Sequence, residues 1–142
     1  MVLFNKFNET VQDLGNGVPN LSSNTLNVML TNTAPTATDH VFSDLVEISA
    51  GNGYVAGGIA VPGGSWVNAA GVSTMSGGSV TWTAGPGDIG PFQYPVVYDA
   101  TTGTLFGWWD YGSPLTLAGA TADQFRWAPD GMLVGGTIFT LA

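Results

Sequence analysis

The stretch FQYPVVYDATTGTLFGWW, residues 92–109, decides the fold class. Residues 92–98 are rich in aromatic and β-branched side chains, which are the residue types that favour strands. Residues 104–109 have a similar composition, and the small and polar residues 99–103 separate the two runs. This pattern predicts a β-hairpin.

Two prolines qualify the first strand of this hairpin. Pro91 and Pro95 lack the backbone N–H that a ladder hydrogen bond needs, which predicts an edge strand or a bulged one. Side chains alternate between the faces of a strand, so Val96 and Tyr98 are expected on one face and Val97 on the other.

Further strands are expected on both sides of the hairpin. Residues 25–31 alternate Leu26, Val28 and Leu30 with Asn27, Met29 and Thr31, which predicts a half-buried strand. Val80 and Trp82 alternate with Thr81 and Thr83 in the same way. Residues 124–127 and 132–134, joined by a turn at 129–131, predict a second hairpin, and residues 137–141 predict a closing strand.

Glycine divides the middle of the chain. Gly57 and Gly58 separate two short strand-like runs and predict a bulge or a close backbone approach. Residues 65–75 fit a strand or a loop equally well, and residues 41–46 have the spacing of a short helix or turn.

The N-terminal residues have a helical period. Phe4, Phe7, Val11 and Leu14 recur at spacings of three and four, which predicts one apolar helix face, and the glycines at 15 and 17 end it. The sequence therefore predicts a single domain over residues 1–142, with a helical segment at 1–17 and a β core at 25–142. The expected fold is mainly β, an antiparallel β-sandwich or barrel-like domain with a short N-terminal helix.

Charge limits the possible functions. The net charge is −8, and Lys6 and Arg126 are the only basic residues. Nucleic acids and anionic membranes need a basic footprint, so neither is an expected partner. Only 8% of the residues are charged, against about 25% in typical soluble proteins. Such a surface suits side-by-side packing of subunits, because few charges lose water on association.

The sequence offers little chemistry. It has no cysteine and one histidine, His40, so a zinc site is not expected, and no nucleophile or phosphate-loop motif is present. We expect no enzyme activity, no catalytic residue, no metal and no cofactor. The sequence has no run of about 18 apolar residues, so no membrane-spanning segment is predicted. The first ten residues lack an apolar signal core, so synthesis in the host cytoplasm is expected.

Aromatic residues are the strongest candidates for binding. Trp108 and Trp109 are adjacent in a predicted strand, so one should lie in the core and the other should be exposed or at an interface. Exposed tryptophans serve as anchors of protein interfaces or as platforms for sugars. A carbohydrate-binding module is therefore one alternative function.

Several strings resemble a family of small virion structural proteins of tailed phages. They are residues 25–35 (TLNVMLTNTAP), 44–48 (DLVEI), 51–54 (GNGY) with Gly57-Gly58, 89–92 (IGPF) through 97–98 (VY), 107–112 (GWWDYG) and 140–142 (TLA). The likeness covers most of the chain and is weakest at residues 59–79 and 113–136.

The resemblance implies a capsid decoration, or cement, protein. Its expected partners are the major capsid protein and further copies of itself, as a dimer or trimer, and its expected place is the outer capsid surface of the virion. A tail or fibre-associated component is the alternative within the same virion. The candidate interface residues are Phe4, Phe7, Val11, His40, Phe42, Trp108, Trp109 and Tyr111.

Overall fold

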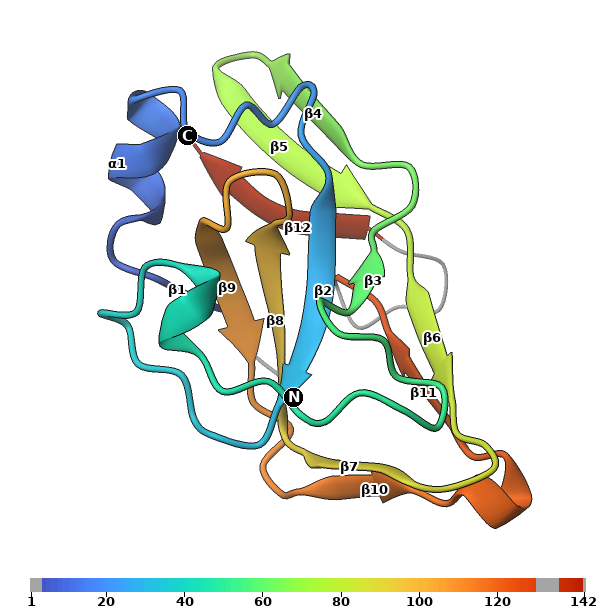
Figure 1. The fold of residues 1–142 in the computed structure, drawn as a ribbon. Helices are drawn as coiled ribbons and strands as arrows, with labels where there is room; N and C mark the ends of the chain where they lie inside the picture. Colours follow the sequence, from blue (N-terminus) through green and yellow to red (C-terminus); the bar gives the residue numbers. More distant parts are fainter. Residues whose placement is uncertain (1–3, 130–135, 142) are drawn as a thin grey trace.

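A five-stranded antiparallel sheet forms the centre of the molecule (Figure 1). The computed structural model describes residues 4–129 and 136–141. The strand order is β1-β9-β8-β2-β3. The bounds of these strands are Phe4–Lys6 for β1, Leu105–Trp109 for β9, Tyr94–Asp99 for β8, Leu26–Thr31 for β2 and Ile59–Ala60 for β3. The predicted hairpin of residues 92–109 is thus confirmed as β8 and β9.

Shorter antiparallel sheets lie against this central sheet. In one, β5 (Val72–Gly77) pairs with β4 (Ser65–Ala69) on one side and with β12 (Gly136–Leu141) on the other. In another, β6 (Val80–Thr83) pairs with β11 (Gln124–Trp127). The two remaining described strands, β7 (Ile89–Phe92) and β10 (Leu115–Leu117), pair with each other. The segment left open between strand and loop, residues 65–75, is therefore the β4–β5 hairpin.

Helical structure is short. Among the described residues, one α-helix, α1, spans Thr10–Gly15, and two 3₁₀ turns span Phe42–Asp44 (η1) and Gly119–Thr121 (η2). The expected helix or turn at residues 41–46 is confirmed as η1. None of the helices in the described residues is long and apolar enough to cross a membrane.

The sandwich core lies between the central sheet and the shorter sheets. Its central-sheet members include Val28, Val97 and Phe106, and Trp82 and Trp127 face them from β6 and β11. All five side chains are buried. The fold is therefore mainly β and sandwich-like, as the sequence predicts.

The opposite face of the central sheet is also covered. A second group of buried residues, called here the outer cluster, consists of Phe7, Met29, Val96, Tyr98 and Leu105. Segments around α1 and η1 lie over this face (Figure 1). Strand β2 is consequently buried on both faces, and the prediction of a half-buried strand is wrong.

A bulge in β9 brings two aromatic residues that are three positions apart, Phe106 and Trp109, into the sandwich core. Val97 pairs with Gly107, whereas Tyr98 pairs with Leu105, so the register skips Phe106. The extra residue shifts the alternation of side chains, as β-bulges do. Phe106 and Trp109 both reach the sandwich core as a result. Gly107 lies under the Phe4 ring, whose Cε2 would be 2.2 Å from a Cβ at this position.

The predicted N-terminal helix is only partly correct. Residues 4–6 form strand β1, in which Phe4 pairs with Trp109, and the helix begins at Thr10. Phe4 and Phe7 therefore do not share a helix face with Val11. The three-and-four spacing of apolar residues reflects two separate burial sites, because Phe4 packs towards the sandwich core and Phe7 into the outer cluster.

The role predicted for Pro95 also changes. Strand β8 lies between β9 and β2 and is central to the sheet. Pro95 stands opposite Leu30 of β2, while the pairing with β9 begins only at Val96. The bulge of this hairpin lies in β9 and not in the proline-containing strand β8, and the edge position predicted for Pro95 is wrong. The expected strand at 132–134 lies outside the described residues, and its partner segment 124–127 pairs with β6.

Candidate interaction surfaces

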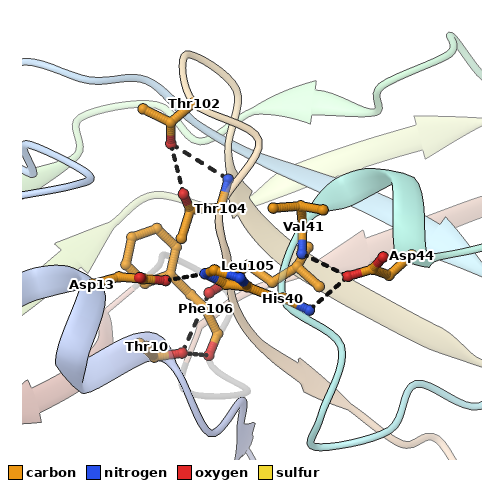
Figure 2. Close-up of polar contacts among 9 residues, drawn as sticks. All are labelled: Thr10, Asp13, His40, Val41, Asp44, Thr102, Thr104, Leu105 and Phe106. Carbon is orange, nitrogen blue, oxygen red and sulfur yellow. Dashed lines mark hydrogen bonds and ion pairs between the residues drawn. The ribbon is translucent and has the colours of Figure 1, made fainter.

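Hydrogen bonds tie α1 to the segment before η1 (Figure 2). We call the surface that α1, this segment and η1 form together the α1–η1 face. The Nε2 atom of exposed His40 lies 2.8 Å from Oδ2 of Asp13 on α1. On the inner side of the helix, the buried Thr10 hydroxyl donates to the carbonyl of Phe106, at 3.0 Å. The helix is thus anchored to β9 below and to His40 beside it.

Asp44 closes the η1 turn. Its Oδ2 accepts hydrogen bonds from the backbone N–H groups of His40 and Val41, at 2.9 and 3.0 Å. Because both bonds favour the charged carboxylate, they hold the pKa of Asp44 below its usual value. The turn is therefore fixed by a charge-assisted cap.

The segment around η1 is attached to the β8–β9 hairpin. The Phe42 N–H donates to the Gly103 carbonyl, at 2.8 Å, and the Leu105 N–H donates to the His40 carbonyl, at 3.0 Å. The Phe42 ring packs on Tyr98 with their centroids 4.8 Å apart. The α1–η1 face is therefore an integral part of the fold, and it exposes the His40 side chain.

An apolar cleft opens between α1, the loop after it and the β4–β5 hairpin. Its volume is about 510 Å³. The lining residues are all uncharged: Val11, Leu14, Gly15, Gly17, Pro19, Asn20, Leu21, Ser22 and Trp66. Val11 is half-exposed at one wall, and Trp66 of β4 packs on Phe139 behind it, with ring centroids 5.9 Å apart. The cleft suits an apolar segment better than a charged ligand.

A long segment of the chain has no charge. No Asp, Glu, Lys, Arg or His occurs between Glu47 and Asp88. This segment contains β3 to β6 and exposes Val55, Val67 and Val72. All the charges of a protein with a net charge of −8 thus lie on the rest of the chain.

A partly buried polar network holds the start of this segment. Oε1 of Glu47 accepts hydrogen bonds from the Tyr54 hydroxyl, at 2.7 Å, and from the Gly57 N–H, at 2.6 Å. The Tyr98 hydroxyl donates to the Gly57 carbonyl, at 2.7 Å. Burial, followed by the hydrogen bond to Glu47, raises the pKa of Tyr54. Sequence reasoning missed this network because its members are brought together only by the fold.

The structure separates the eight candidate interface residues. Phe7 and Trp109 are only 1% and 4% exposed, so neither is available to a partner. Phe4 and Tyr111 are partly buried against the sandwich core, and Phe42 and Trp108 are partly buried against the outer cluster. Val11 and His40 remain exposed.

The tryptophan pair follows the predicted alternation. Trp109 lies in the sandwich core, and Trp108 lies on the opposite face, where its ring centroid is 4.6 Å from that of Phe7. Trp82 and Trp127 are buried, and Trp66 is partly buried. None of the five tryptophans is fully exposed.

Within residues 4–129 and 136–141, no group of three or more His, Asp or Glu side chains is placed to hold a metal ion. The described pockets are lined mainly by neutral side chains. Comparison of the chain with family models, curated proteins and solved structures gives no match.

Proposed function

We propose that the chain is a structural protein of a phage virion that attaches to the outer surface of the major capsid protein and stabilises the head shell. The observation that carries this proposal is the uncharged apolar cleft between α1 and the β4–β5 hairpin. The sequence resemblance supplies the identity of the partner, and the cleft supplies a place to receive it.

The cleft suits an apolar segment of a neighbouring subunit. Its walls combine the half-exposed side chain of Val11 with the flat Trp66 ring. Burying one Val, Leu or Phe side chain there contributes about 1.5–3 kcal/mol. A decoration protein is present in many copies and makes several contacts, so modest gains of this size add up across a shell.

The surrounding charge distribution also supports attachment through this side. The cleft needs no desolvated charge to be paired, whereas the α1–η1 face presents Asp39, Asp44 and His40. Desolvating a charge on association is costly unless the partner satisfies it. Apolar docking in the cleft avoids that cost.

The experiment mixes the purified protein with capsids that lack it and were assembled from the major capsid protein of the same genome. Sedimentation and imaging of the particles then report binding. We expect symmetric, stoichiometric density on the shell. Binding to purified tails instead of heads would favour the alternative tail or fibre role and would overturn the decoration role.

A matched pair of variants locates the contact. Val11→Glu puts a charge on the cleft wall, whereas Gln12→Glu puts the same charge on the exposed neighbouring position outside the cleft. We expect the first variant to lose capsid binding at least tenfold and the second to bind normally. Equal binding by both variants would remove the cleft from the proposal.

A further inference from the structure

Strand β4 ends its sheet with an open edge. The strand order β12-β5-β4 leaves one side of β4 without a partner strand among residues 4–129 and 136–141. In Figure 1, the β4–β5 hairpin lies at one end of the molecule, with β4 outermost. An edge of this kind presents unpaired N–H and C=O groups that another strand can join.

The β4 edge lacks the usual protection against pairing. Natural edge strands are blocked by charged residues, prolines, bulges or shortness. β4 reads SWVNA, without charge or proline, and its five residues pair with β5 in unbroken register. Its outward-facing side chain Val67 is 57% exposed. The edge is therefore suited to strand addition.

We propose that two copies of the chain pair through antiparallel β4 strands across a two-fold axis centred on Val67. Val67 then stands opposite Val67 of the second copy, Trp66 opposite Asn68, and Ser65 opposite Ala69. The two three-stranded sheets become one continuous six-stranded sheet. The exposed Val67 side chains cover each other, and the remaining pairs are neutral.

The neutral β4 edge allows a second copy to be the occupant. Identical chains with a net charge of −8 repel each other on most approaches. The region between Glu47 and Asp88 is the longest charge-free stretch of the sequence, and β4 lies within it, so pairing through β4 brings no charge of that region into the contact. A two-fold interface must also be self-complementary, and the sequence around Val67 meets that condition. This inference stands whether or not the protein binds capsids.

Disulfide trapping tests the pairing directly, because the natural chain has no cysteine. Directly opposed residues of an antiparallel pair have Cα atoms about 4.5–5.5 Å apart, within the range that a disulfide spans. We expect Val67→Cys to form a covalent dimer readily on oxidation of the purified protein. The control Val55→Cys, at a position that is 67% exposed, should cross-link far more slowly.

The register has its own test. Two Ala69→Cys chains would place their cysteines about 13 Å apart, four residues out of register, and should not cross-link with each other. A mixture of Ser65→Cys and Ala69→Cys chains should form the mixed disulfide. Equal trapping by Val67→Cys and Val55→Cys, or trapping by Ala69→Cys alone, would overturn the proposed pairing.

Sedimentation without a cross-link completes the test. We expect the wild-type chain to sediment as a dimer at micromolar concentration and Val67→Lys to sediment as a monomer. Val46→Lys, which adds the same charge at a 63% exposed position outside the charge-free region, should remain a dimer. Thermal unfolding followed by circular dichroism checks that both variants fold. A wild-type chain that stays monomeric at millimolar concentration would refute the dimer.

Discussion

The hydroxyl group of Tyr54 donates a hydrogen bond to Oε1 of Glu47, at 2.7 Å, and accepts one from the buried Leu30 N–H, at 3.0 Å. The same carboxylate oxygen also receives the Gly57 N–H. One tyrosine therefore joins the central strand β2 to the loop that begins the charge-free segment. This loop leads to β3 and β4, so the network helps to position the hairpin that we assign to self-association.

Tyr54→Phe is expected to destabilise the fold by about 1–3 kcal/mol at neutral pH, because it leaves the Leu30 N–H buried without its acceptor. Denaturant unfolding measures this loss. Tyr94→Phe, at a tyrosine outside the network, is the control and should change stability much less. Equal losses in the two variants would contradict the structural role of the Tyr54 hydroxyl.

The stability that the Tyr54 hydroxyl contributes should depend on pH in the alkaline range. Burial and the Glu47 hydrogen bond raise the pKa of Tyr54 in the folded state, whereas an unfolded tyrosine ionises near pH 10. The stabilising contribution is complete below pH 10 and is lost as the pH rises towards the folded-state pKa. The stability gap between wild type and Tyr54→Phe should therefore narrow above about pH 10, as unfolding curves at several pH values will show.

Asp44 predicts an acid dependence of the opposite sign. Hydrogen bonds from the Val41 and His40 N–H groups lower its folded-state pKa. The contribution is present above the unfolded-state pKa near 4 and disappears as the pH falls through the folded-state value. Asp44→Asn should lower the melting temperature at pH 7 and match wild type well below pH 4. Glu9→Gln is the control, since Glu9 makes no side-chain cap bond to α1.

Gly58 is expected to tolerate no side chain. A Cβ at this position would lie 1.8 Å from the Val28 carbonyl oxygen, and its φ is +76°. Gly17 has nearly the same φ, +74°, with open space around it. Gly17→Ala should cost about 1–2 kcal/mol for the left-handed backbone. Gly58→Ala should cost more than about 4 kcal/mol or prevent folding. Equal losses would show that the close approach to β2 relaxes easily.

Phe7 distinguishes a core role from an interface role. It is 1% exposed and packs with Trp108 in the outer cluster. Phe7→Ala should cost about 3–5 kcal/mol of folding stability. Val11→Ala, at a half-exposed position, should change stability by about 0.5 kcal/mol or less. A stable Phe7→Ala variant with impaired capsid binding would restore Phe7 to the interface.

Sequence patterns correctly predicted those strands whose burial alternates locally along the chain. Val80 and Trp82 are buried and Thr81 and Thr83 are exposed, as the alternation indicates. The β8–β9 hairpin was also predictable, because its two strands are consecutive in the sequence and a short turn joins them. The predicted alternation of Val96, Val97 and Tyr98 is confirmed by their division between the two clusters.

Features that depend on distant partners were not predictable. Phe4 forms a strand because it pairs with Trp109, and no local period contains that information. Met29 is buried because segments around α1 and η1 cover its face of β2, although its position in the alternation suggested exposure. The candidate surfaces show the same limit: the cleft combines residues 11–22 with Trp66, and the β4 edge is defined by strand order.

The connectivity of the central sheet has a consequence for biosynthesis. Leu26 pairs with Asp99 and Phe4 pairs with Trp109, so β1 and β2 are synthesised well before their partner strands β9 and β8. Translation proceeds at roughly 5–20 residues per second, which leaves β2 without its neighbour β8 for several seconds. During that interval the locally paired β4–β5 hairpin is able to form first. On polysomes, where nascent copies are close together, the pairing of two chains proposed above needs only this hairpin from each of them.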